Sequence, residues 1–426
     1  MHISTRFSVI ALSLATPLAL LAQSSAPSQA DLIQALLARI DKLEKRVAEL
    51  ETKSAATWRD GGRTVVVPTP VAESPVVHGT ATQVHDHEAP VAGGYTSPSL
   101  RLAGFSDFNF AATDQHGAKS GFNEGQFILH LSSALSSKVS YFGELSFTAR
   151  SDAGMGSPAA PGFNIEVERS IIRFDQSDKL KISFGRYHTP INYWNTQYHH
   201  GSWLQTSESR PEMIQFGGSF LPVHFIGALA EGALPAGGLN LNYNAGVGNG
   251  RGAVISRGGD FGDINNNRAW LVNLFVKPDQ LYGLQAGGSA YRDEITLGAT
   301  SYREWITSGH LVWARENPEV IAEVANVRHE GIGPIGGLSN SIAYYVQTAY
   351  RLPWWERLWK PYYRFEYIHI PKSDTVFRLV PSLNESIVGM RYDISSFAAL
   401  KLEYRNIARP GQPRVNGAFA QTSFTF

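Results

Sequence analysis

The chain ends with the stretch Val415-Asn416-Gly417-Ala418-Phe419-Ala420-Gln421-Thr422-Ser423-Phe424-Thr425-Phe426. Successive side chains of an extended strand point to opposite faces. One face of this stretch is therefore largely apolar and carries Ala418, Ala420, Thr422, Phe424 and Phe426. The other face is polar and carries Gln421, Ser423 and Thr425. This period of two predicts a β-strand with one apolar and one polar surface.

A C-terminal strand that ends on an aromatic residue resembles the closing strand of bacterial outer-membrane β-barrels. The resemblance implies that residues 418–426 pair antiparallel with the first strand, near residues 100–110. It also implies that the barrel-assembly machinery recognises Phe426. Taken alone, the stretch also fits a soluble sandwich that ends on an edge strand.

The N-terminus predicts export. Arg6 precedes an apolar run over residues 8–22, and small residues follow it. This order is typical of a secretory signal peptide. We expect residues 1–22 to be removed, with cleavage after Ala26 as the alternative. The chain contains 0 Cys, which excludes a disulfide framework, and no later run predicts a transmembrane helix.

Composition excludes nucleic acid as a partner and favours a strand-rich fold. The 37 basic residues balance 37 acidic ones, so no bias toward polyanions is present. The 40 Gly, 9 Trp, 17 Tyr and 22 Phe supply tight turns and aromatic anchors for many short strands.

Residues 31–53 predict a short coiled-coil helix. Apolar residues recur at heptad positions a and d, occupied by Ile33, Ile40 and Val47 at a and by Leu36, Leu43 and Leu50 at d. In a parallel partner Arg39 would face Glu44, which favours self-association. We expect a homo-oligomer, with a trimer favoured over a dimer, whose coil lies in the periplasm. A lone amphipathic helix on a surface is the alternative.

Residues 54–98 show no sustained period and predict a flexible linker. His78, His85 and His87 lie in this linker near acidic residues. Imidazole and carboxylate groups at such spacing bind zinc in some proteins. A solvated polar linker is the alternative, and the sequence leaves the choice open.

From Leu100 onward, segments with alternating apolar and polar residues recur about every twenty residues. In one of them Leu400, Leu402 and Tyr404 alternate with Lys401, Glu403 and Arg405. The sequence does not show which face points to water. The number and uniformity of the segments favour an all-β fold, a transmembrane antiparallel β-barrel of 16 strands over residues 99–426, with 14 or 18 as alternatives.

Connections and aromatic residues complete the expected barrel. Long Gly- and Asn-rich interruptions predict extracellular loops at residues 111–122, 149–163, 188–211 and 248–267. Periplasmic turns are expected at Ser136-Ser137 and Leu221-Pro222. The aromatic clusters predict interfacial girdles and include Tyr193, Trp194, Trp354, Trp355, Trp359, Tyr362 and Tyr363.

The most informative insertion begins with Gly185-Arg186-Tyr187-His188-Thr189-Pro190 and closes on Ser209-Arg210-Pro211. A strand with this ending, followed by an aromatic-rich loop, resembles the phosphate-selective porin family. In that family the corresponding loop folds inward and narrows the pore. The resemblance implies a barrel that passes small solutes or ions.

Five residues of this insertion are the candidates for a pore constriction: Arg186, His188, His199, His200 and Arg210. Such a ring would tune passage by charge and hydrogen bonding. With ordinary imidazole pKa values it would become more cationic below about pH 6.5. The alternative is an outward-facing loop whose His and Trp residues pack on each other.

Enzyme motifs are weak in this sequence, and no cofactor is expected. Residues 331–336 fit G-x-G-x-x-G, but Pro334 lies inside the motif and no helix pattern follows it. A barrel-embedded hydrolase and an envelope-linking structural barrel are the alternative functions. The sequence predicts an outer-membrane porin, in contact with membrane lipid, that passively admits small hydrophilic solutes or ions.

Overall fold

The computed structural model describes residues 42, 45, 98–149, 162–215, 220–252, 255–256, 258–259 and 262–426. The predicted signal peptide and the linker up to residue 97 lie outside the described residues. So does the predicted coiled coil, apart from Lys42 and Lys45, which are helical. No helix within the described ranges is long and apolar enough to cross a lipid bilayer.

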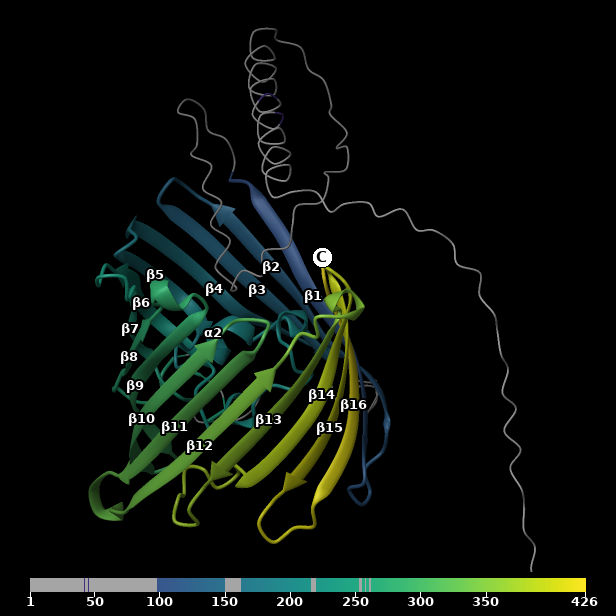
Figure 1. Ribbon diagram of the computed structural model, residues 1–426. Coiled ribbons are helices and arrows are strands. Elements are labelled where there is room, and N and C mark those ends of the chain that lie inside the picture. The colour runs from purple at the N-terminus through teal and green to yellow at the C-terminus, as the bar shows by residue number, and fades with distance from the viewer. Residues whose placement is uncertain are drawn as a thin grey trace, which may run out of the picture. The chain divides into compact units, whose positions relative to one another are not determined.

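The described residues from 98 onward form sixteen strands that close into one antiparallel barrel (Figure 1). This confirms the predicted fold and strand number. The strands are β1 (Leu100–Thr113), β2 (Gly121–Ala134), β3 (Val139–Ala149), β4 (Phe163–Ser177), β5 (Leu180–His188), β6 (His224–Leu234), β7 (Leu241–Asn249), β8 (Ala269–Val276), β9 (Leu284–Leu297), β10 (Thr300–Trp313), β11 (Glu319–Gly331), β12 (Leu338–Ala349), β13 (Trp359–His369), β14 (Leu383–Ser395), β15 (Ala398–Ala408) and β16 (Val415–Thr425).

The barrel closes between its first and last strands. β16 pairs antiparallel with β1, from Phe105 opposite Thr425 to Thr113 opposite Gly417. Phe426 extends the seam, because it exchanges two backbone hydrogen bonds of 2.8 and 3.1 Å with Gly104. In Figure 1 the yellow β16 lies beside the blue β1. The predicted pairing is confirmed, and closure leaves the described sheet without an exposed edge.

β12 shows most clearly which face points outward. Its residues alternate between exposed and buried along the whole strand. Tyr344 and Val346 are exposed, whereas Ser341 and Gln347 are buried toward the interior. A soluble sandwich would bury the apolar face instead. The structure therefore decides a point that the sequence left open, because the apolar face is outside and the polar face is inside, as in transmembrane barrels.

The four long interruptions predicted from the sequence all lie at one end of the barrel, between β1 and β2, β3 and β4, β5 and β6, and β7 and β8. The Ser136-Ser137 turn lies at the opposite end, between β2 and β3. The predicted turn at Leu221-Pro222 is wrong, since the insertion after β5 continues to the start of β6 at His224. Met213 and Ile214, which precede the predicted turn, are buried in the barrel interior.

The aromatic girdle is only partly as predicted. Trp354 and Trp355 are 52% and 66% exposed near the start of β13, where a girdle is expected. Tyr193 and Trp194 are only 3% and 1% exposed, so their assignment to a girdle is wrong. They belong to the insertion between β5 and β6, which enters the barrel. Tyr362 also points inward and is buried.

Candidate functional site

The insertion at residues 189–223 folds into the barrel and is called the inward loop here. It contains α2 (Trp194–Tyr198) and two short 3-10 helices, η1 (Ser202–Leu204) and η2 (Glu212–Ile214). Figure 1 shows α2 within the ring of strands. Many of its side chains are buried, among them Ile191, Trp194, His199, Arg210 and Met213. Contacts with strands around the barrel show that the loop crosses the interior.

The start of α2 is fixed by β11. The backbone N–H groups of Tyr193 and Trp194 both donate to Oε1 of Glu323, each at 2.7 Å. The first N–H groups of a helix have no partner within the helix. The buried Glu323 side chain supplies the missing acceptor at this position.

Further along, the inward loop meets Arg364 of β13 with Lys401 and Glu403 of β15, a set called the far anchor. Arg364 donates to the Ser207 hydroxyl at 2.8 Å and to the Ser209 carbonyl at 2.9 Å. Glu403 accepts the Ser209 N–H at 3.1 Å and its hydroxyl at 2.9 Å. Lys401 donates to the Ser207 carbonyl at 2.9 Å. Charged groups therefore hold this part of the loop by several hydrogen bonds.

Where the inward loop leaves and rejoins the wall, four imidazoles form the histidine cluster: His188, His199, His200 and His224. His188 ends β5 and pairs with His224, the first residue of β6. His199 and His200 directly follow α2. The ring centroid of His199 lies 3.8 Å from that of His188, 4.6 Å from that of His200 and 4.8 Å from that of His224.

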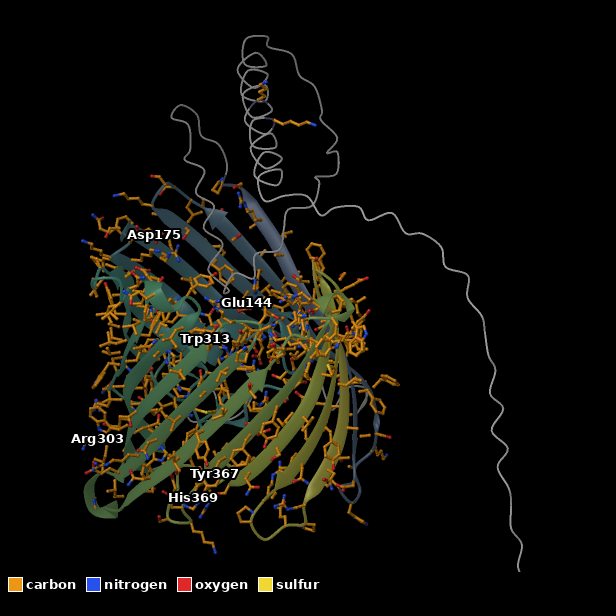
Figure 2. All side chains as sticks on the ribbon, viewed as in Figure 1. Glu144, Asp175, Arg303, Trp313, Tyr367 and His369 are labelled. Atoms are coloured by element: carbon orange, nitrogen blue, oxygen red, sulfur yellow. The ribbon has the colours of Figure 1, made fainter. Side chains whose placement is uncertain are left out.

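Two buried carboxylates line the wall beside the cluster. His188 Nε2 lies 3.3 Å from Oε2 of Glu144 on β3. Nε2 of His200 and of His224 lie 3.5 and 2.7 Å from the carboxylate oxygens of Glu168 on β4. Figure 2 shows Glu144 inside the barrel, away from the rim where Arg303, Tyr367 and His369 lie. The cluster therefore joins the inward loop to the wall formed by β3, β4, β5 and β6.

Burial changes the protonation of the loop residues. It holds the pKa of His199 well below the usual 6.5, and neighbouring His188, His200 and Arg210 lower it further. The prediction that this ring charges just below pH 6.5 is therefore wrong for His199. Burial also lowers the pKa of Arg210 to about 9, so that its guanidinium remains charged near neutral pH.

The structure brings the five predicted constriction residues to one region. His188, His199 and His200 meet directly in the histidine cluster. Arg186 reaches it through an Nη2 atom 3.2 Å from Nδ1 of His224. Arg210 donates to the His199 carbonyl and, at 3.1 Å, to the Ile214 carbonyl. Their role in narrowing a pore remains a prediction.

Sequence reasoning missed the wall residues that hold the loop. Glu144 and Glu403 fall on the polar faces of predicted strands, so an inward direction was foreseeable for both. Glu168 follows the alternation of Ile165 and Val167 with Glu166, so its direction was readable too, whereas His224 and Glu323 lie in no such clear alternation. The sequence around these wall residues does not show which atoms of the inward loop they contact, because the contacting residues are distant in sequence.

One further cluster bears on the hydrolase alternative. The two ring nitrogens of His329 lie 3.0 Å from Glu304 and 3.0 Å from Asp374. The Ser341 hydroxyl donates to Asp374 at 2.9 Å, not to the imidazole. A serine nucleophile needs a histidine nitrogen as its base. This cluster therefore has the residue types of a catalytic triad, but its serine is hydrogen bonded to the aspartate and not to the histidine.

The glycine motif at residues 331–336 is a turn. It connects the antiparallel strands β11 and β12 and contains η4 (Gly333–Ile335). A dinucleotide fingerprint requires a following helix in a βαβ unit. The structure confirms the prediction that the motif does not belong to such a unit.

Solved structures of outer-membrane proteins share the barrel fold. The anion-selective porin from Comamonas acidovorans is 12% identical with a TM-score of 0.55, over 78% of this chain and 100% of that one. OmpF from Salmonella typhi, in complex with daunomycin, is 11% identical with a TM-score of 0.55, over 77% and 97%. The outer membrane channel DcaP from Acinetobacter baumannii is 9% identical with a TM-score of 0.52, over 78% and 99%.

At these identities the likeness shows the fold. No known family model matches the sequence, and no curated protein matches it. The comparisons support a porin-like barrel in general, whereas the resemblance to the phosphate-selective family remains a prediction.

Proposed function

We propose that the protein is an outer-membrane porin through which small hydrophilic solutes or ions diffuse passively. One observation carries this proposal: a closed barrel with an apolar outside and a polar inside holds a loop across its interior. A closed barrel satisfies its backbone groups without water, as crossing a bilayer requires. The function needs neither a catalysed step nor a cofactor.

The inward loop would set the width and charge of the path. Arg186, His188, His199, His200 and Arg210 lie where this loop meets the wall, which supports a constriction there. Replacing Arg186, His199 and His200 together by Ala should raise single-channel conductance and change ion selectivity. The matched control is His369→Ala, which alters an exposed imidazole at the rim. Unchanged conductance and selectivity in the triple variant would refute the constriction.

Ion selectivity is expected to be weak. Several basic side chains of the interior are paired with carboxylates: Arg364 with Glu366 at 2.6 Å, Lys360 with Glu319 at 2.7 Å and Arg391 with Asp393 at 2.7 Å. Paired charges offer little net attraction to an anion. Reversal potentials in asymmetric KCl should lie close to zero. Strong anion selectivity, or a chloride current blocked by phosphate, would instead favour a phosphate-selective porin.

Assembly at the outer membrane would use the two ends of the chain. We propose that the barrel-assembly machinery recognises Phe426 and that a periplasmic coiled coil at residues 31–53 supports a homotrimer. Deleting Phe426 removes its hydrogen bonds to Gly104 and should reduce the amount of folded barrel in outer-membrane fractions. Barrels that do form should conduct as the wild type does. Equal yields would count against this role.

The oligomer is tested separately from the barrel. The mass of the detergent-solubilised protein should correspond to a trimer and should decrease when residues 31–53 are deleted.

A folded barrel that never conducts in a planar bilayer would contradict the porin proposal and favour an envelope-linking structural role.

A further inference from the structure

We propose that the histidine cluster binds one divalent metal ion of the Zn²⁺ class, which fastens the inward loop to the barrel wall. The ligands are His188, His199 and His200, with Glu144 beside them as the source of a fourth donor. This inference does not rest on conduction, because a metal site is detected by binding alone.

The three imidazoles already lie at nearly metal-binding separation. One ring nitrogen from each of His188, His199 and His200 lies within 4.8 Å of the others. Zinc–nitrogen bonds of about 2.0–2.1 Å place tetrahedral ligand atoms about 3.4 Å apart. Small rotations of the side chains would close the difference. Imidazole is a favoured ligand of zinc and of neighbouring late first-row metals.

Hydrogen bonds prepare His199 as a ligand. The Asn195 amide nitrogen donates to the carbonyls of Thr189 and Val223, each at 2.9 Å. Its Oδ1, an acceptor only, lies 2.8 Å from Nδ1 of His199. Nδ1 must therefore carry the proton, and Nε2 carries the lone pair that a metal needs. Metal-ligating histidines are commonly oriented by such a hydrogen bond from the other ring nitrogen.

The site also supplies negative charge for a cation. Glu144 and Glu168 are 0% and 4% exposed and flank the four imidazoles. Arg169 pairs with Glu144 at 2.6 Å, and Arg186 lies 3.8 Å from Glu168. With Arg210, three guanidinium groups oppose the cation, and two carboxylates compensate them. This balance favours ligation by neutral imidazole over a purely electrostatic cation site.

His188 gives the most direct indication of a missing ligand. It is 6% exposed, and its Nε2 makes no hydrogen bond although it lies 3.3 Å from Glu144. A buried polar atom without a hydrogen bond is costly, and most such atoms in proteins have a partner. A metal ion bound to Nε2 would satisfy it.

The metal would link the end of β5 to the residues that follow α2 in the inward loop. His188 is fixed by the ladder between β5 and β6, whereas His199 and His200 belong to the inward loop. Binding would therefore couple metal affinity to the folded position of the loop. The expected consequence is a loop that resists displacement when the ion is present.

The test uses the full-length protein without a polyhistidine tag. His78, His85 and His87 are replaced by Ala in the background protein, because these linker residues offer another zinc site. The protein is refolded with Zn²⁺ and dialysed, and retained zinc is measured by elemental analysis. We expect about one zinc per chain in the background protein. His199→Ala should lose it, and the exposed-site control His369→Ala should keep it.

Two controls guard against misfolding. Heat-modifiable migration on gels checks that each variant forms a barrel, and His199→Gln provides a polar variant of similar size.

The coordination geometry is tested by spectroscopy. Co²⁺ in place of Zn²⁺ should give the intense visible absorption of a tetrahedral site in the background protein. No retained zinc, zinc that survives both His199 substitutions, or the spectrum of hydrated Co²⁺ would each overturn the proposal.

Discussion

Two of the places that hold the inward loop, the far anchor and the histidine cluster, differ in their chemistry. At the far anchor, the guanidinium of Arg364, which cannot be deprotonated in proteins, is 0% exposed and pairs with Glu366 at 2.6 Å. At the histidine cluster, burial holds the pKa of His199 well below 6.5, so the ring there is neutral. The far anchor should therefore be constant near neutral pH. The histidine cluster should respond to acid and to metal, which makes one side of the loop fixed and the other adjustable.

Breaking the far anchor should have the largest effect. Arg364→Met leaves Glu366 buried without its cationic partner, whereas Glu403 keeps Arg405 at 2.9 Å. Removing one partner of a buried ion pair costs about 3–5 kcal/mol. Urea unfolding in detergent micelles should show a loss of this size, and proteolysis should become faster within the inward loop. A loss below about 1 kcal/mol, typical of an exposed pair, would contradict this account of the far anchor.

Removing the acceptor for α2 should have the next largest effect. Glu323→Leu leaves the N–H groups of Tyr193 and Trp194 without the one oxygen atom that accepts both, and we expect a loss of about 1–3 kcal/mol. Glu323→Gln keeps an acceptor oxygen and should recover much of the loss. Equal unfolding free energies for the two variants would show that these hydrogen bonds do not stabilise the loop.

Acid should weaken the histidine cluster while the far anchor persists. Because the pKa of His199 is lowered in the folded protein, the unfolded chain binds more protons below pH 6.5. The unfolding free energy should therefore fall as pH falls below 6.5, by up to about 1.4 kcal/mol per pH unit from this residue. Unfolding measured from pH 7.5 to 5 should show a shallower decline for His199→Gln. Arg364→Met should keep the wild-type slope, and identical slopes in all three proteins would rule out this role.

The smallest effect is expected at the rim. Arg303 and Glu330 form a 3.4 Å pair whose side chains are each 40% exposed. Such pairs contribute about 0–1 kcal/mol. Arg303→Met is therefore the matched control for Arg364→Met, and urea unfolding should separate the two clearly. A loss at Arg303 as large as that at Arg364 would mean that burial does not distinguish the two sites.

The alternating pattern was sufficient to predict the barrel but not its interior. The polar face of β16, including Gln421 and Ser423, was readable from the sequence, and so was its pairing with β1. The sequence did not show which face points outward, since a sandwich and a barrel share the same alternation of apolar and polar residues. The turn predicted at Leu221-Pro222 was wrong because no local pattern shows that the insertion after β5 stays inside the barrel until His224.

The candidate site was predicted only as far as it is local. Arg186, His188, His199, His200 and Arg210 are close in sequence, so their grouping was foreseeable. Glu403 lies 194 residues from Ser209, to which it is hydrogen bonded. Only closure of the barrel brings such pairs together, and no spacing rule reports them. The hydrogen bond from His199 to Asn195 is local, and the helical spacing of these two residues was an unused signal.

Single-channel conductance tests the central claim most directly, namely that a loop held across the lumen controls passage. The comparison is between the wild type and a chain in which residues 194–215 are replaced by a short Gly-Ser linker. Both proteins should form heat-modifiable barrels in the same membrane. We expect the wild type to conduct and the loop-replaced protein to show a larger unitary conductance. Equal conductances, or no conductance in either folded protein, would contradict the account.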